Sequence, residues 1–164
     1  MLENQAIRSL REILRSHLDW HGSRLDLLAR FILALLQVRT VNLAKVAVIL
    51  SDRATKDSNY IRLQRFFRDF KFDMELIAKM VAAVLLPSHE AWILTMDRTN
   101  WKFGRKEINL LVLGVAYGNI SIPLFWVNLG KAGNSNTEER ITLIQRFLHA
   151  FPKQLIAYLL ADRE

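Results

Sequence analysis

Helix-breaking residues are confined almost entirely to the second half of the chain. Residues 1–86 contain one glycine, Gly22, and no proline, whereas residues 87–164 contain the other five glycines and all three prolines. Because glycine and proline interrupt helices and favour turns, the sequence predicts a helical domain over residues 1–86 and a domain of strands and turns over residues 87–164. The expected fold class is therefore α+β or α/β.

Apolar residues in the first region recur at the spacing of an α-helix. Ile7, Leu10, Leu14 and Leu18 fall on one helical face, and Gly22 is expected to end that helix. Residues that cap helix N-termini mark the later starts. Four further helices are predicted: from Ser23 to about Val38, from Thr40 to about Leu50, from Asp57 or Ser58 onward, and from Asp73 to Pro87.

The predicted helix that begins at Asp57 or Ser58 carries two stripes. An apolar stripe comprises Tyr60, Leu63, Phe67 and Phe70, and a basic stripe comprises Arg62, Arg65 and Arg68. The basic stripe fits the phosphate-contacting face of a helix-turn-helix-like unit, with residues 40–50 as its supporting helix. The solvent-exposed face of an ordinary amphipathic helix has nearly the same pattern.

The second region predicts the order strand, strand, strand, helix, strand. Residues 91–96, 108–117 and 120–129 are apolar, and Gly118-Asn119 between the last two is typical of a hairpin. Pro123 places the third strand at a sheet edge or a bulge. Ser135-Asn136-Thr137-Glu138 predicts a capping box for a helix reaching about Phe151, and residues 155–161 form the final strand.

Charge and composition narrow the partners and the compartment. The net charge of +7 favours polyanionic partners, without separating nucleic acid from a membrane surface. The longest apolar runs are far too short to cross a bilayer, so no membrane span is expected. Without cysteine the chain forms neither disulfides nor thiolate zinc sites, and the reducing cytoplasm is the expected location.

Two aspartates end apolar strands, and each is followed by arginine. Asp97 follows the first predicted strand and Asp162 follows the last. If these two strands lie parallel and adjacent, the carboxylates converge, because neighbouring strands are about 4.8 Å apart. Paired carboxylates are suited to share a hard cation such as Mg²⁺ or Mn²⁺. The alternative is that each Asp only ends a strand and caps a turn.

Three segments together resemble the DDE transposases of bacterial insertion sequences. They are Met96-Asp97-Arg98-Thr99-Asn100-Trp101, the loop Gly130-Lys131-Ala132-Gly133-Asn134-Ser135-Asn136-Thr137, and Leu160-Ala161-Asp162-Arg163-Glu164. The resemblance covers most of residues 57–164 and is greatest to the branch whose third acid lies in a Tyr-Arg-Glu-Lys signature. It implies an incomplete ribonuclease-H-like catalytic core at residues 87–164, preceded by a helical DNA-binding region at residues 1–86.

The same resemblance implies metal-dependent chemistry on DNA. Such enzymes cut transposon-end DNA and join it to a target by two-metal phosphoryl transfer, and Asp97 and Asp162 match the first two acids of their catalytic, metal-binding triad. The third acid is expected well downstream, and Glu164 matches the segment after the second acid instead. The chain is therefore expected to be a truncated transposase that binds Mg²⁺ or Mn²⁺ weakly and is inactive alone.

Two alternative functions follow from an incomplete triad. The chain could act only as a DNA-binding or interfering partner of an intact transposase, or it could be a remnant without function. Both for a truncated transposase and for an interfering partner, the expected ligand is the double-stranded DNA of transposon ends. Arg98, Lys102, Arg105 and Lys106 flank Asp97 and are candidates to hold DNA phosphates near the metal, although a solvated basic loop would look the same.

The last predicted strand is exposed to self-pairing. Residues 155–161 read Leu-Ile-Ala-Tyr-Leu-Leu-Ala, with no charged residue. In an incomplete core this strand becomes a sheet edge, and an apolar edge without Lys, Pro or a bulge is a template for pairing with another chain. The chain is therefore expected to self-associate or to need a partner.

Overall fold

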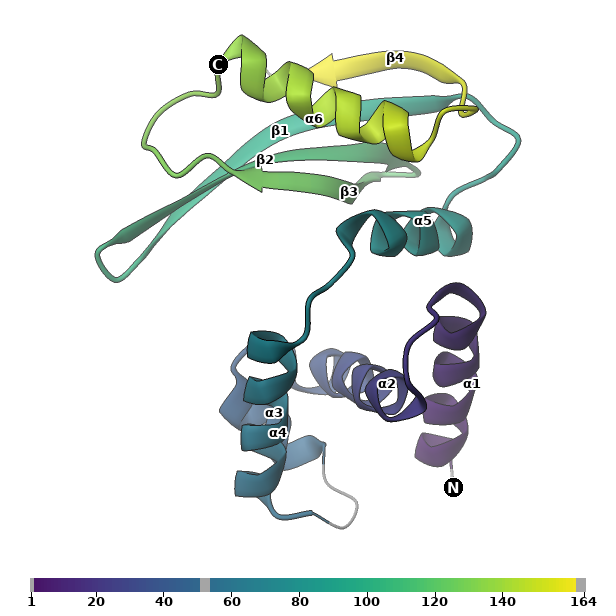
Figure 1. Cartoon of the computed structure of the whole chain (residues 1–164), viewed down its shortest axis with the longest axis vertical. Coiled ribbons are helices and arrows are strands. Elements are labelled where there is room, and N and C mark those ends of the chain that lie inside the picture. The colour runs from purple at the N-terminus through teal and green to yellow at the C-terminus, as the bar shows by residue number, and fades with distance from the viewer. Residues whose placement is uncertain (1, 51–53, 162–164) are drawn as a thin grey trace. The chain divides into compact units, whose positions relative to one another are not determined.

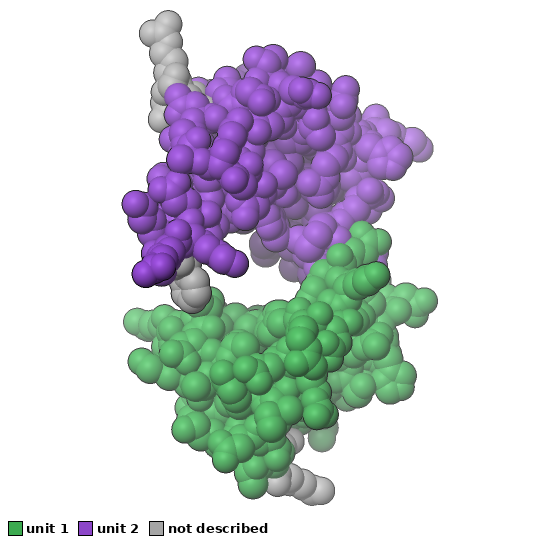
Figure 2. All heavy atoms as spheres, turned by 60° about the vertical axis from the view of Figure 1, so that its left-hand side comes forward, with its two compact units in different colours: residues 1–73 green, residues 74–164 purple. Residues whose placement is uncertain are grey.

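The computed structural model describes residues 2–50 and 54–161. Within these residues the protein is mixed α+β, with six helices and one four-stranded sheet, and five helices precede the first strand (Figure 1). The α+β class and the order of its parts are thereby confirmed. The chain divides into two compact units, residues 1–73 and residues 74–164, which Figure 2 colours separately.

The first unit holds four helices: α1 (Leu2–His17), α2 (Gly22–Val38), α3 (Leu43–Ile49) and α4 (Lys56–Asp69). The prediction that Gly22 ends the first helix is wrong, because Gly22 is the first residue of α2. The residue before it, His21, is the N-cap, and its ring Nδ1 accepts a hydrogen bond from the backbone N–H of Ser23 at 3.3 Å. A capping side chain therefore decides this boundary.

Aromatic and aliphatic side chains form the core of the first unit. From α4, Leu63 and Phe66 are 0% and 7% exposed, whereas Phe67 is 41% exposed. The predicted apolar stripe is right for Leu63 and wrong for Phe67, because the α4 face that packs in the cluster with Val46 of α3 passes through Phe66. The Phe66 ring stacks on that of Phe70, with centroids 5.5 Å apart.

The second unit is built on a sheet with the strand order β3-β2-β1-β4. Its elements are α5 (Met74–Leu85), β1 (Trp92–Phe103), β2 (Lys106–Tyr117), β3 (Ile120–Asn128), α6 (Thr137–Ala150) and β4 (Ile156–Ala161). β1 to β3 are antiparallel neighbours, and β4 returns parallel to β1. This confirms the predicted element order, and it meets the condition that the last strand lies parallel and adjacent to the first.

β1 is longer than predicted, and this changes the position of Asp97. β1 and β2 continue into a two-residue turn at Gly104 and Arg105, where Gly104 has a φ of 61° that glycine adopts without strain. Asp97 consequently lies inside β1, opposite Val112 of β2. The prediction that Asp97 ends a strand is therefore wrong.

Both helices of the second unit pack on one face of the sheet. Ala78 and Ala82 of α5 and Phe147 of α6 share one buried cluster with alternate residues of β1 and β2, such as Leu94 and Leu113. The sequence-based boundary after residue 86 had grouped α5 with the preceding helices. α5 instead joins the sheet, because its small alanines are buried in the sheet's core.

The start of α6 is held by a capping box one residue later than predicted. The Asn136 side chain accepts from the backbone N–H of Glu139, and the Glu139 carboxylate accepts from the backbone N–H of Asn136. The prediction that Ser135 and Glu138 form this box is wrong, because Ser135 is buried and its Oγ accepts from Arg140 Nε at 2.7 Å.

Pro123 lies at a position where its missing N–H does not interrupt the hydrogen bonding inside the sheet. β3 is an edge strand of the described sheet, and the β2–β3 register shifts between Leu113 and Gly114, with Gly114 opposite Pro123. Proline cannot donate to a neighbouring strand and is confined to edges and bulges. The prediction of an edge or a bulge is confirmed on both counts.

β4 forms the opposite edge of the described sheet. In residues 2–50 and 54–161 it pairs only with β1, and all six of its residues are exposed. Tyr158 is 55% exposed and lies opposite Ile93 of β1. An unprotected apolar edge of this kind can pair with the same edge of a second copy.

We expect the chain to associate through β4 and Tyr158→Lys to weaken that association by about tenfold or more. Like charges brought together at an interface cost several kcal/mol, and 1.4 kcal/mol corresponds to a factor of ten in Kd. Sedimentation velocity at increasing concentration measures the effect, with circular dichroism as the check on folding. Tyr117→Lys, at a similarly exposed tyrosine outside β4, is the matched control. A wild-type chain that stays monomeric at high concentration would contradict the prediction.

Candidate functional site

Asp97 projects from the sheet face opposite the two helices. Side chains alternate along a strand, and its neighbour Met96 is buried in the core with Leu94. Asp97 therefore shares the other face with Thr95 and Thr99. Its carboxylate is exposed and accepts a hydrogen bond from the backbone N–H of Arg98 at 2.7 Å. The oxygen atoms of Asp97 are thus accessible to a ligand.

The register between β1 and β4 shows how closely the second predicted acid, Asp162, is approached by the described residues. Met96, directly before Asp97, pairs with Ala161, the last residue of β4. Asp162 follows Ala161 in the sequence but lies outside the described residues. The pairing required for the two acids to converge is therefore present up to the residue before each of them.

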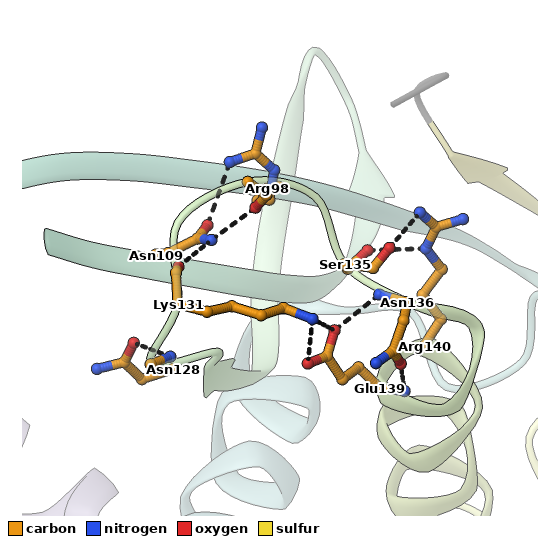
Figure 3. Close-up of polar contacts among 10 residues, drawn as sticks. Arg98, Asn109, Asn128, Lys131, Ser135, Asn136, Glu139 and Arg140 are labelled. Atoms are coloured by element: carbon orange, nitrogen blue, oxygen red, sulfur yellow. Dashed lines mark hydrogen bonds and ion pairs between the residues drawn. The ribbon is translucent and has the colours of Figure 1, made fainter.

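Arg98 lies on the opposite face from Asp97 and holds a loop. Its guanidinium donates to Asn109 Oδ1 at 3.3 Å (Figure 3) and to Asn134 Oδ1 at 3.5 Å. Asn109, 2% exposed, donates in turn to the backbone carbonyls of Lys131 and Gly133, each at 2.9 Å. These contacts tie the loop between β3 and α6 to the middle of the sheet.

Sequence reasoning missed Asn109. The signal was a single amide inside the apolar run of residues 108–117, and a buried amide needs hydrogen-bond partners. Its partners here are carbonyls of a loop more than twenty positions away, which the sequence does not identify. Asn109 is a structural anchor for the loop that carries Asn134 and Lys131.

Lys131 secures the other end of this loop. Its ammonium group lies 2.8 Å from one carboxylate oxygen of Glu139 and 3.0 Å from the other, and Glu139 also accepts from the backbone of Asn136 (Figure 3). The loop is therefore fixed at β2 by Asn109 and at the start of α6 by Glu139.

The other basic residues predicted beside Asp97 lie along the β1–β2 hairpin. Lys102 is exposed and pairs with Glu107 at 3.6 Å, and Arg105 occupies the exposed turn, followed by Lys106. At about 3.3 Å per residue, Arg105 is on the order of 26 Å from Asp97 along β1. Arg105 and Lys106 are therefore not gathered at the Asp97 carboxylate.

The predicted basic stripe lies on the exposed surface of α4, but its members differ. Arg68 forms two hydrogen bonds to the carboxylate of its neighbour Asp69, at 2.6 and 3.0 Å. The hydrogen bond from Arg68 holds the pKa of Asp69 below its ordinary value. Arg62 and Arg65 form no ion pair in the described part of the chain. Of the three arginines in the stripe, Arg68 is the one that is paired with a carboxylate.

Comparison with known proteins leaves the site to be interpreted from its own geometry. Neither family models, nor curated proteins, nor solved structures gave a match to this chain. Within residues 2–50 and 54–161 no three His, Cys, Asp or Glu residues come together as a metal site. In the same residues no single helix has the length and hydropathy to span a membrane, and α2 and α3 pass that test only as a pair bent by 104°.

Proposed function

We propose that this chain carries the helical DNA-binding region and the first two catalytic acids of a DDE transposase. The observation that carries the proposal is the parallel pairing of β4 with β1, with Met96 opposite Ala161. An antiparallel three-stranded meander, a helix and a parallel strand beside the first are the order expected of a ribonuclease-H-like core. Its substrate would be transposon-end DNA in the cytoplasm.

A divalent metal would be held by Asp97 together with Asp162. Carboxylate oxygens are ligands suited to Mg²⁺ or Mn²⁺, and the Asp97 carboxylate is exposed on the sheet face opposite α5 and α6. When bound, such an ion polarises the phosphate and activates the attacking oxygen. The described residues supply one carboxylate to this site, and the Tyr-Arg-Glu-Lys signature is absent from the sequence, so weak metal binding is expected.

A second candidate function is DNA binding without catalysis, alone or as an interfering partner of an intact transposase. It is favoured by the two arginines of α4 that form no ion pair in the described residues, Arg62 and Arg65, and by the excess of basic over acidic residues before Pro87, 14 against 9. This function needs neither metal nor a third acid. Metal binding therefore separates the two candidates.

We expect the chain to bind Mn²⁺ weakly and Asp97→Asn to reduce that affinity by more than about tenfold, because loss of groups that support a metal site costs 10–100-fold. Asp162→Asn should have the same effect. Electron paramagnetic resonance of free Mn²⁺ measures the binding, and Asp57→Asn, on α4, is the control. Equal Mn²⁺ affinity in all four proteins would contradict a shared metal site and leave the DNA-binding candidate.

The wild-type chain and an Asp97→Ala variant test for catalysis. With two of three acids present, we expect no nicking of supercoiled plasmid DNA in Mg²⁺ or Mn²⁺. Nicking that Asp97→Ala abolishes would show that the chain is active alone and that the third acid is not required.

A further inference from the structure

A basic groove lies within the first unit, between the first turns of α2 and the second half of α4. Its volume is about 280 Å³. Arg24 from α2 and Arg62 and Arg65 from α4 line it, together with Leu27, Phe66 and Phe70. Arg24 was not singled out from the sequence, because it is separated from the basic stripe of α4 by more than thirty residues.

The Arg24 side chain is held in place by an aromatic ring. Its guanidinium carbon lies 4.5 Å from the centroid of the Phe70 ring. Phe70 is itself fixed by edge contacts with Trp20, at 4.6 Å, and Phe72, at 5.1 Å. A guanidinium stacked on a ring keeps N–H groups at its edge for oxygen acceptors. Arg24 is therefore oriented before any ligand arrives.

The carboxylate of the one acidic residue that lines the groove is hydrogen-bonded to an arginine outside the groove. Asp69 also lines it, but both of its carboxylate oxygens accept hydrogen bonds from Arg68. In the described residues no ion pair joins Arg24, Arg62 or Arg65 to a carboxylate. Three arginines from two helices thus share a groove with one carboxylate, which is hydrogen-bonded to Arg68 and also attracted to Arg65, so positive charge is in excess.

An anion would relieve the repulsion among these three arginines. Guanidinium groups match phosphate oxygens in geometry as well as charge. We infer that the groove binds a backbone phosphate of duplex DNA, with Arg24, Arg62 and Arg65 as its ligands and Arg68 outside the site. The identity of the anion rests on the proposed function, whereas the composition of the groove does not. This assignment replaces one member of the sequence-based stripe with a residue from another helix.

The test is the salt dependence of binding to a short DNA duplex of mixed sequence. Fluorescence anisotropy of labelled duplex, titrated with the full chain over a range of NaCl concentrations, yields the slope of log K against log salt. Each phosphate contact contributes about −0.9 to that slope. Arg24→Gln, Arg62→Gln and Arg65→Gln should each weaken binding and flatten the slope, by up to about 0.9. Arg8→Gln, at an exposed arginine of α1 that does not line the groove, should leave the slope unchanged.

Arg24→Lys guards against a folding artefact. Lysine keeps the positive charge, so the slope of log K against log salt should be retained. Lysine lacks the planar guanidinium that stacks on Phe70, so the affinity for DNA should fall. Circular dichroism checks that each variant is folded. If Arg24→Gln binds DNA as tightly as the wild type, the groove is not the phosphate site. The proposal that the chain binds DNA would be unaffected by that result. If the wild-type chain binds no duplex at low salt, the phosphate assignment and the DNA-binding part of the proposed function fall together.

Discussion

Phe147→Ala is expected to lower the free energy of unfolding of the second unit by about 3–5 kcal/mol, the usual cost of truncating a buried aromatic side chain. Phe147 is 0% exposed. Its ring contacts those of Trp92, Phe125 and Phe151, with centroids 6.2, 6.4 and 5.2 Å away. Since these partners come from two strands and the end of α6, the cavity cannot be closed by movement of one element.

Urea unfolding followed by tryptophan fluorescence measures this loss. Trp92, Trp101 and Trp126 lie in the second unit and only Trp20 in the first, so the signal reports chiefly on the sheet. Leu148→Ala, next along α6 and 45% exposed, is the control and should cost less than about 0.5 kcal/mol. Similar losses for the two variants would contradict the packing of α6 on the sheet.

Gly114→Val should destabilise the second unit by about 3 kcal/mol, near the upper end for an overpacked site. A Cβ at this position would lie 2.5 Å from Ser121 Oγ and 2.8 Å from the backbone carbonyl oxygen of Ile122. Ser121 reaches across Gly114 to hydrogen-bond Thr95 Oγ1 at 2.6 Å. The glycine therefore lets β1 and β3 hydroxyls meet over β2, beside the bulge at Pro123.

Two comparisons separate the steric causes, with the same unfolding assay as the measurement. Adding Ser121→Ala to Gly114→Val removes the hydroxyl contact but not the carbonyl contact, so only part of the stability should return. Ala116→Val adds two methyl groups on the same face of β2 and should change stability by less than about 0.5 kcal/mol. If Gly114→Val is tolerated as well as Ala116→Val, β2 and β3 do not approach this closely.

Much of the second unit was predictable because its signals are local. Gly118-Asn119 lies between two apolar runs, and the structure has a hairpin there, with a φ of 60° at Gly118. Pro123 indicated an edge or a bulge from its missing N–H alone. The parallel return of β4 beside β1 was only a condition for the two acids to converge, because the order of the elements along the chain does not determine which strands pair. By contrast, Gly104-Arg105 carries a similar turn signal, but the polar residues around it hid the extension of β1.

The candidate site was predictable only in part. Asp97 was located from its sequence context, but its position inside β1 follows from pairing with β2. Nothing near Asn109 in the sequence shows that the carbonyls of Lys131 and Gly133 are its partners. Arg24 likewise joins Arg62 and Arg65 only because α2 and α4 pack together.

Backbone preference and hydrophobic period were enough to separate a helical region from a sheet region and to give the order of the elements along the chain. Both signals depend on residues that are only a few positions apart. Packing between distant segments determined the rest: α5 joined the sheet because Ala78 and Ala82 are buried there, and Phe66 rather than Phe67 entered the core. It also set the partners of Arg24 and Asn109. Such contacts depend on how whole elements are rotated and docked, and the spacing of residues along one helix or strand does not record that.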